Sequence, residues 1–401
     1  MKKQIISLFY FVLILNFVNA QWSITNDIFG GPNYCFTKIN NNIFVGTDRY
    51  GIYKSTNNGD NWTQVNNGLP FDGYVYPWIH TFAINGGNIF AGTYGKGVFL
   101  SSDSGNSWTA VNTGLTNLFV QTIAIDSNKI FVGTSGGGVY YSSNNGSNWT
   151  AKNTGFTSDN IQSLLINGNN IFAGTEGGVY KSNNNGNIWV KISTGILNQA
   201  QVEALLIKGN NIFAGTWGYG LFLNTTNGNS WNSSNNGFTD IDILSLAENN
   251  NNLFAGTYGG GIYISIDNGG YWYEINTGFP NNGYLTYVFS IFINDSTIFA
   301  GTETGVWKRS LSEVDIKEIN KSISFNIYPN PASNKLNIEF KLFSFSNKKK
   351  IKIYDIQGRI LFEQIILNDN TDIDISTLEK GIYILKLCIK DKTEVTTFVK
   401  E

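Results

Sequence analysis

The chain has 401 residues, enough for two or three domains, and its composition excludes several classes of protein. Charged residues make up only 14%, aromatic residues also reach 14%, and glycine occurs 44 times, which is typical of many short strands joined by glycine-rich turns. We therefore expect an all-β fold. Residues 21–312 contain 11 Lys and Arg against 16 Asp and Glu, a balance of −5, so we expect no nucleic-acid partner.

Residues 1–20 have the layout of a secretory signal peptide. The segment starts with the basic residues Lys2 and Lys3, continues with an apolar run, and ends on the small residue Ala20. The apolar run is shorter than the roughly 20 residues that a membrane span needs, and no later stretch approaches that length. We therefore expect an exported protein whose mature chain begins near Gln21 and has no transmembrane segment.

An internal repeat occupies the middle of the chain. The phrase Ile-Phe-Ala-Gly-Thr, with small variations, occurs seven times at spacings of 46, 41, 41, 41, 41 and 45 residues, with its glycines at Gly46, Gly92, Gly133, Gly174, Gly215, Gly256 and Gly301. Each copy has the pattern of four short strands separated by Gly and Asn turns. Four strands in about 40 residues are typical of a propeller blade, so we predict a seven-bladed β-propeller over residues 21–312.

The seventh copy lacks its last strand, which begins with Trp in the other copies. The segment from Trp22 to Asn26 matches that strand, and Trp22 precedes the equivalent Trp62 by 40 residues, which is within the repeat period. We therefore predict that the N-terminal strand completes the seventh blade and closes the ring, so that no sheet edge is left open there.

A turn of fixed composition joins the third and fourth strands in six copies. Its fullest forms contain Asp103, Gly105 and Trp108, and Asp267, Gly269 and Trp272, while the other copies have Asn57, Asn144, Asn184 or Thr226 at the Asp position. This turn resembles the Asp box, or BNR repeat, of sialidase-like propellers, and the chain also resembles the single-propeller photosystem assembly factors. We interpret the box as structural, because its polar side chains can accept hydrogen bonds from turn amides while its Trp ring packs on the blade.

The repeat ends near Ser312 and charge density rises. We assign residues 313–322 to a linker and 323–401 to a small second domain. Its separated motifs contain Tyr328, Pro329, Asn330, Pro331, Gly358, Gly381 and Lys400, and they resemble the type IX secretion C-terminal sorting domain of Bacteroidetes-type bacteria. The resemblance implies an Ig-like β-sandwich that the type IX secretion machinery reads, so that the protein passes through the periplasm and is placed on the outer cell surface or secreted. The alternative is an ordinary adhesive Ig-like module.

The candidate binding residues lie in turns. In propellers of the kind that the chain resembles, turns after the second strand share the ligand face with the loops between blades. The residues after each Gly-Thr pair are Asp48, Tyr94, Ser135, Glu176, Trp217, Tyr258 and Glu303. We predict that Tyr94, Glu176, Trp217 and Tyr258 form a rim for a glycan or a protein, joined by Tyr76, Trp78 and Tyr284 from the two longer connections. The alternative is that each aromatic ring only covers its own hairpin.

Two columns of the repeat mark the inner strands. Eleven residues before each Gly of the Gly-Thr pair stand small residues: Cys35, Thr81, Thr122, Ser163, Ala204, Ser245 and Ser290. The residue before each of these is Tyr34, His80, Gln121, Gln162, Glu203, Leu244 or Phe289. We expect the small residues to pack around a crowded axis and His80 to line the mouth of the ring, as a polar group rather than a catalytic base.

Enzymatic hypotheses have weaker support. A sialidase needs three arginines on the substrate carboxylate, and residues 21–312 contain only Arg49 and Arg309. A glycoside hydrolase needs two carboxyls roughly 5–9.5 Å apart, and Asp48 with Glu303 is the best pair. One histidine and scattered acids give no metal-ligand spacing, so we expect no metal and no cofactor. Our leading hypothesis is a non-enzymatic binding propeller, and the alternative is a hydrolase of extracellular polysaccharide.

Overall fold

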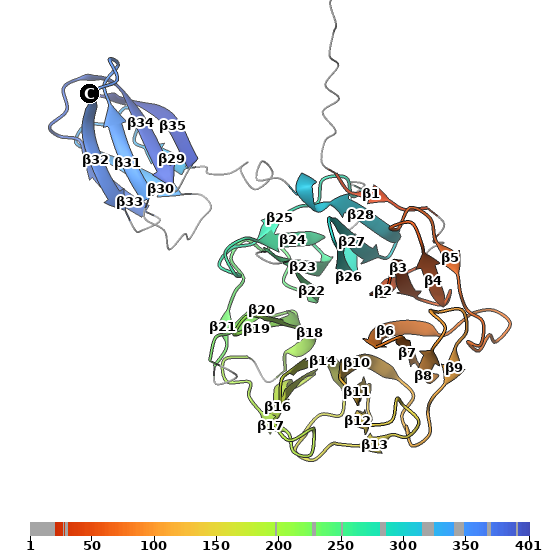
Figure 1. The fold of residues 1–401 in the computed structure, drawn as a ribbon. Coiled ribbons are helices and arrows are strands. Elements are labelled where there is room, and N and C mark those ends of the chain that lie inside the picture. The colour runs from red at the N-terminus through yellow and green to blue at the C-terminus, as the bar shows by residue number, and fades with distance from the viewer. Residues whose placement is uncertain are drawn as a thin grey trace, which may run out of the picture.

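A computed structural model describes residues 21–26, 28, 31–196, 199–226, 230–249, 252–280, 286–314, 325–340, 349–366, 370–389 and 392–401. The predicted signal peptide, Tyr284 and most of the predicted linker lie outside these residues. The described residues form β-strands, turns and one short 3-10 helix, Leu311–Glu313. They build a ring of small sheets and a separate two-sheet domain (Figure 1).

Seven four-stranded units make up the ring. The first blade contains β2 (Asn33–Ile39), β3 (Asn42–Thr47), β4 (Ile52–Ser55) and β5 (Thr63–Gln64), and the second contains β6 (Trp78–Asn85), β7 (Asn88–Tyr94), β8 (Gly97–Ser101) and β9 (Thr109–Ala110). The third blade contains β10 (Val120–Asp126), β11 (Lys129–Thr134), β12 (Gly138–Ser142) and β13 (Thr150–Ala151). The fourth contains β14 (Ile161–Asn167), β15 (Asn170–Thr175), β16 (Gly178–Ser182) and β17 (Val190–Lys191). The fifth blade contains β18 (Gln201–Lys208), β19 (Asn211–Trp217), β20 (Gly220–Asn224) and β21 (Asn232–Ser233). The sixth contains β22 (Ile243–Asn249), β23 (Asn252–Gly259), β24 (Ile262–Ser265) and β25 (Tyr273–Glu274). The seventh contains β26 (Thr286–Asn294), β27 (Thr297–Thr302), β28 (Gly305–Ser310) and the N-terminal strand β1 (Ser23–Ile24).

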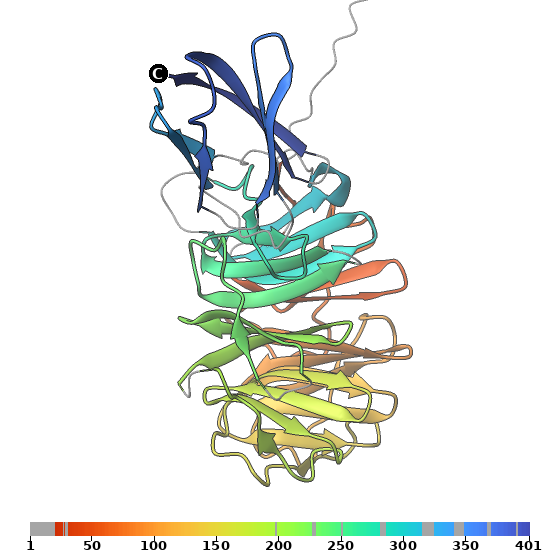
Figure 2. The same ribbon diagram turned by 90° about the vertical axis from the view of Figure 1, so that its left-hand side faces the viewer.

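This architecture confirms the predicted all-β, seven-bladed propeller. The strands β2, β6, β10, β14, β18, β22 and β26 surround the axis in Figure 1, and the side view in Figure 2 shows strands that run between two faces carrying the turns. Blades six and seven are joined into one sheet, because β23 extends far enough to pair Tyr258 with Tyr287 of β26.

The core lies between the blades and is built from the repeat phrase. Its Phe residue is fully buried in all seven copies: Phe44, Phe90, Phe131, Phe172, Phe213, Phe254 and Phe299. The second strand of each blade is buried on both faces because each blade is covered by its two neighbours, which explains its nearly continuous apolar sequence. One core cluster, for example, joins Phe44 of the first blade to Ile79, Ile89 and Trp108 of the second.

The N-terminal strand closes the ring as predicted. Within β1, Ser23 pairs with Lys308 and Ile24 with Trp307, both in β28. The preceding Trp22 is 1% exposed, and its indole Nε1 donates a hydrogen bond of 2.7 Å to the carbonyl of Ile275 in the sixth blade. Every gap between neighbouring blades is therefore bridged by the same kind of strand.

The second domain is a sandwich of two antiparallel sheets. One contains β29 (Phe325–Tyr328), β30 (Lys335–Phe340) and β33 (Asn370–Asp374), and the other contains β32 (Ile360–Ile366), β31 (Lys349–Tyr354), β34 (Gly381–Ile389) and β35 (Lys392–Lys400). Their facing sides bury one apolar cluster that includes Leu336, Ile338, Ile353 and Leu385. This agrees with the small β-sandwich that was expected from the sequence.

The motif residues of this domain hold its two ends together. Asn330 accepts a hydrogen bond of 2.9 Å from the amide of Val399 on its Oδ1, and Ala332 forms an isolated bridge with Lys400. Tyr328 remains 46% exposed at the end of β29. Gly358, with φ of 82°, completes a turn whose amides donate to the carboxylate of Asp355.

Ring closure by Trp22 leads to a first prediction. Trp22→Ala should lower the free energy of unfolding by about 3–5 kcal/mol, because it leaves a large cavity and removes the indole hydrogen bond to Ile275. Ile24→Ala, on the same strand but 52% exposed, should change it by less than about 1 kcal/mol. Denaturant unfolding of the mature chain measures both, and equal effects would contradict the closing role of Trp22.

Candidate functional site

Two kinds of connection share one face of the ring. In the second and third blades, the turn after the second strand is bonded to the loop that enters the next blade. The amide of Gly97 donates to Leu118 O at 3.0 Å, and that of Gly138 donates to Asp159 O at 2.9 Å. We call this side the Gly-Thr face. The turns that follow the inner strands lie on the opposite side with the Asp boxes, where Lys129 Nζ donates to Asn185 Oδ1 at 2.9 Å.

The Asp boxes are occupied by internal hydrogen bonds. The carboxylate of Asp103 accepts from the hydroxyl of Ser107 and from the amides of Ser107 and Asn106. These bonds, with the Ser107 hydroxyl contributing most, lower the pKa of Asp103 to about 2. Trp108 is buried and donates its indole Nε1 to Val65 O of the preceding blade at 2.9 Å. Asp267 accepts hydrogen bonds from the hydroxyl of Ser265 and from the amide of Tyr271. The boxes therefore brace turns, and their Trp side chains contact the neighbouring blade.

A continuous series of ring contacts crosses the Gly-Thr face. In order around the ring from the fifth blade to the third, its members are Trp217, Tyr258, Tyr287, Phe289, Tyr34, His80, Tyr94 and Phe119, with Trp78 stacked on Tyr94. Neighbouring ring centroids lie between 4.1 Å, for Tyr258 and Tyr287, and 6.4 Å, for Tyr287 and Phe289. We call this set the aromatic arc. Three members are clearly exposed: Trp217 at 42%, Tyr94 at 38% and Phe119 at 45%.

The first long connection adds a pocket at one end of the arc. The predicted residues Tyr76, Trp78 and Tyr94 line a cavity of about 330 Å³ together with Phe71 and Lys96. The guanidinium of Arg49 lies 5.8 Å from the Trp78 ring centroid. These sequence-predicted residues are therefore brought together, although they come from a loop and from two strands of the second blade.

A β-bulge aims one side chain of each inner strand at the axis. In all seven blades the pairing of the first two strands shifts register by one residue, between Asn33 and Cys35 in the first blade and at the equivalent place in the others. The residues skipped by the pairing are Tyr34, His80, Gln121, Gln162, Glu203, Leu244 and Phe289. Bulges are commonly used to redirect a side chain, and here they create a ring of seven.

These seven residues, with Gln201, line a cavity of about 270 Å³, which we call the axial pocket. Its composition differs from side to side. Blades three to five contribute Gln121, Gln162, Gln201 and Glu203, whereas blades seven and one contribute the rings of Phe289 and Tyr34. The pocket therefore combines an amide and carboxyl wall with an aromatic wall.

The small residues next to the bulges tie neighbouring inner strands together. Ser163 Oγ donates to Val202 O at 3.1 Å, and Ser290 Oγ donates to Asn33 O at 2.8 Å. Burial raises the pKa of the Cys35 thiol, so it stays protonated. This column packs the axis as expected, and it leaves the adjacent bulge residues as the side chains that face the pocket.

The axial pocket changes the acidity of its titratable groups. Burial raises the pKa of Glu203 from its ordinary value of 4.5 to about 7; a hydrogen bond from Gln201 opposes this rise, and the nearby carboxylate of Glu176 adds to it. Burial likewise lowers the pKa of His80 to about 4, so its imidazole is neutral at pH 7. The pKa of Tyr34 rises to about 12, mainly through burial.

The candidate catalytic pair of the alternative hypothesis lies at the start of the ring. Asp48 is partly buried, burial raises its pKa, and its neighbour Arg49, at 3.6 Å from its Oδ1, opposes this rise. Glu303 is exposed, and its backbone carbonyl accepts a hydrogen bond from Gly31. Arg309 is buried and donates to Ile275 O, so its guanidinium is engaged within the scaffold.

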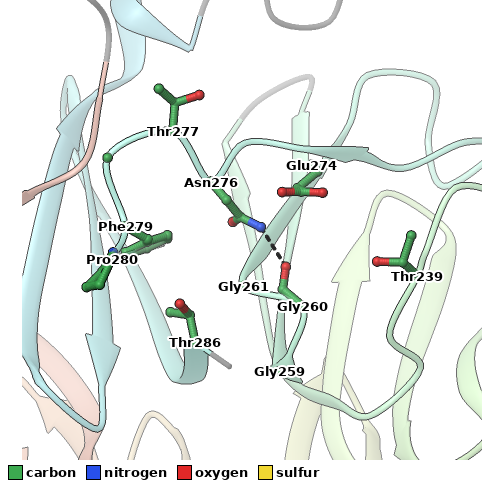
Figure 3. Close-up of a pocket in the computed structure, with 11 residues that line it drawn as sticks. Thr239, Gly259, Gly260, Gly261, Glu274, Asn276, Thr277, Phe279, Pro280 and Thr286 are labelled. Atoms are coloured by element: carbon green, nitrogen blue, oxygen red, sulfur yellow. Dashed lines mark hydrogen bonds between the residues drawn. The ribbon is translucent and has the colours of Figure 1, made fainter. Parts of the chain in front are cut away.

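A wider pocket of about 590 Å³ lies between blades six and seven (Figure 3). It is lined mainly by glycine backbone and by the side chains of Thr239, Glu274, Thr277 and Phe279, and the Asn276 amide donates to Gly260 O at 2.6 Å. Phe279 is stacked on Trp22, with ring centroids 4.9 Å apart, and therefore belongs to the closure of the ring. This pocket contains none of the predicted rim residues within the described part of the chain.

Sequence reasoning missed several members of the site. Tyr34, Gln121, Glu203 and Phe289 were recognised only as a column shared with His80, and Tyr287 and Phe119 were not singled out. The bulge would have been predicted if the pairing register of each inner strand had been known. The register cannot be read from the spacing of the repeat, because all seven blades contain the same shift. Among the described residues there is no group of three or more potential metal ligands, and no helix has the length and apolar character of a membrane span.

Family models match the first part of the propeller and the second domain. Residues 28–170 match the DUF6242 beta propeller domain, and residues 326–401 match the secretion system C-terminal sorting domain. The protein is a β-propeller with a type IX secretion sorting domain. This confirms the sorting assignment made from the motifs, and it indicates transport to the cell surface or outside the cell. No curated protein matches the chain in sequence.

Solved structures show how widely this propeller fold occurs. YCF48 bound to D1 peptide aligns with a TM-score of 0.56 and 13% identity, covering 74% of this chain and 98% of that one. The extracellular domain of the putative hybrid two component system BT4673 from B. thetaiotaomicron aligns with a TM-score of 0.61 and 18% identity, and the alignment covers 80% of this chain and 46% of that one. The GH74 enzyme of Niastella koreensis aligns with a TM-score of 0.53 and 18% identity, and the alignment covers 72% of this chain and 44% of that one. The chain thus spans less than half of the last two, and these identities show a shared fold alone.

The raised pKa of Glu203 predicts a pH-dependent stability. The folded state binds the proton of Glu203 more tightly than the unfolded state does. The free energy of unfolding is therefore highest below pH 4.5, where Glu203 is protonated in both states, and it falls as pH rises through about 7. Glu203→Gln should therefore raise the free energy of unfolding by up to about 3 kcal/mol at pH 8 and leave it unchanged below pH 4.5. Glu248→Gln, at an exposed carboxyl of the next inner strand, is the control. Thermal unfolding at both pH values measures the difference; a pH-independent effect of Glu203→Gln would contradict it.

Proposed function

We propose that this protein is a secreted, non-enzymatic binding propeller that recognises a glycan through its Gly-Thr face. The aromatic arc carries this proposal. Aromatic rings offer flat apolar surfaces of the kind on which sugar rings stack, and the polar tips of Tyr and Trp remain available for hydrogen bonds. The amides and carboxyls beside the arc can both donate to and accept from hydroxyl groups.

The shape of the arc favours a glycan over a protein as the ligand. A protein interface usually gathers its apolar residues in a dry centre with a polar rim. Here the rings follow a curve that forms one wall of the axial pocket, and the other wall of the pocket is polar, so the apolar residues are not gathered in one dry centre. A chain of sugar units can follow a curve of separate stacking surfaces, and a pocket at its centre can hold one unit.

Export determines where such binding takes place. The sorting domain directs the protein to the cell surface or outside the cell, where polysaccharides are abundant. The solved structures that share the fold include a peptide-bound protein and a glycoside hydrolase, so the fold itself does not select the ligand.

Substitutions in the aromatic arc test the proposal. Trp217→Ala and Tyr258→Ala should each weaken polysaccharide binding at least about tenfold, because each removes a stacking surface and its buried apolar area. Ile188→Ala, at a residue that is 52% exposed in an Asp box on the opposite side, should leave binding unchanged. A glycan array followed by affinity electrophoresis measures this. An empty array, together with a surface protein retained by a pull-down, would show that the ligand is a protein instead.

A glycoside hydrolase remains the second candidate, since burial raises the pKa of the partly buried Asp48, which is the direction that suits a general acid. In that case purified protein should release soluble sugar from a polysaccharide that it binds, and Asp48→Ala or Glu303→Ala should abolish the release while binding persists. Binding without release by the wild-type protein would exclude this candidate.

Removal of the sorting domain should change the location of the protein. A chain that ends before residue 323 lacks the domain matched by the sorting family, so we expect a folded propeller to accumulate in the periplasm. Cell fractionation with protease accessibility on intact cells measures this. Unchanged delivery to the surface or medium would mean that another segment carries the export signal.

A further inference from the structure

The axial pocket contains a carboxyl group that lacks a cationic partner in the described part of the chain. Eight described residues line the pocket, and none of them is Lys or Arg. Glu203 shares the region with a second carboxylate, Glu176, in a propeller domain that is acidic overall. A buried carboxylate is costly unless a positive charge or several hydrogen bonds compensate it, so the pocket is electrostatically suited to a cation.

The other groups in the pocket also suit a cationic donor. The Nε2 atom of His80 is buried and has no hydrogen-bond partner within the described residues. A neutral imidazole has one nitrogen that accepts a hydrogen bond, and each glutamine side chain adds an amide oxygen. On the opposite wall the rings of Tyr34 and Phe289 lie 5.5 Å apart, edge to face, and aromatic faces attract cations.

We propose that the axial pocket binds a primary ammonium group carried by an amino sugar of the glycan. This inference rests on the proposed function and specifies its ligand. An ammonium group has three hydrogen-bond donors and no acceptor, which complements Glu203, the glutamine oxygens and His80 Nε2. The cavity has a volume of about 270 Å³, and we expect it to hold one sugar unit of the glycan.

Other ligands fit this pocket less well. A calcium ion requires six to eight oxygen ligands, usually with several carboxylates, and the pocket offers one carboxyl of its own. A neutral sugar would supply hydroxyl groups but no charge to balance Glu203. An anionic sugar would be repelled by Glu203 and Glu176.

The bulge supplies an internal comparison that supports a binding role. At the residue preceding each bulge six blades have Val or Ile and the first has Asn, and at the following residue all seven have a small residue. Between these uniform positions the bulge residue varies among aromatic, amide, acidic and aliphatic types. The fold therefore requires the flanking residues but not Glu203, which leaves its side chain available for a ligand.

Isothermal titration of the mature chain at pH 7 with three monosaccharides tests the proposal. D-glucosamine carries the ammonium group, N-acetyl-D-glucosamine has the same ring without the charge, and D-glucose replaces the group with a hydroxyl. We expect D-glucosamine to bind at least tenfold more tightly than the other two, and Glu203→Gln to remove this preference. Glu176→Gln should reduce it partly, because Glu176 acts on the pocket electrostatically but is not among the residues that line it. The exposed control Glu248→Gln should preserve it.

Each outcome has a distinct meaning. Equal affinity for the three sugars, or a preference that survives Glu203→Gln, would overturn the proposal. Binding of L-lysine but not of D-glucosamine, with the same dependence on Glu203, would also overturn it and indicate a protein ligand. The arc variants separate this inference from the proposed function. If polysaccharide binding depends on Trp217 and Tyr258 but not on Glu203, only the ammonium site is wrong.

Discussion

The packing of Trp22 against the last two blades is the contact on which the rest of the propeller depends. Its amide donates to Thr277 O and its indole donates to Ile275 O, which are the contacts that Trp108 and Trp149 make with the blades before them. Because the inner strands of blades seven and one meet only in a closed ring, Phe289 and Tyr34 can face the blade-five residue Glu203 across one pocket only when this closure is formed.

The bulges explain how a repetitive scaffold carries a non-repetitive site. Each repeat must keep a small residue where neighbouring inner strands touch, as Ser163 and Ser290 do with their bonds to the next strand. The bulged residue is excluded from the ladder, so its side chain is free of that packing requirement. Seven such positions around an axis can vary independently, and here they divide into an amide and acid wall and an aromatic wall. The same geometry that maintains the ring thus presents the residues that distinguish this propeller.

Most of the fold followed from the sequence, and only part of the site did. The Gly-Thr spacing and the match of Trp22 to Trp62 were sufficient for the blade count and the closure, because a repeat period reports topology directly. The predicted rim residues Trp217, Tyr258 and Tyr94 do lie in the aromatic arc. Their connection through Tyr287 arises from a strand extension that joins two blades, which no period encodes. The raised pKa of Glu203 depends on burial and on the carboxylate of Glu176. Glu176 and Glu203 belong to different blades, and only the folded ring brings them near each other.

The arc and the axial pocket differ in what they can discriminate. A stacking surface such as Trp217 accepts many sugar rings, because its contact is apolar and broad. A pocket with a buried carboxyl rejects ligands that lack its complement, since an uncompensated charge costs more than a lost apolar contact. In a combined site the arc would therefore supply most of the affinity and Glu203 most of the selectivity. Such a division suits a protein that is exported to a surface where many glycans compete. Stacking on the arc would hold a polysaccharide, and the axial pocket would select one of its sugar units.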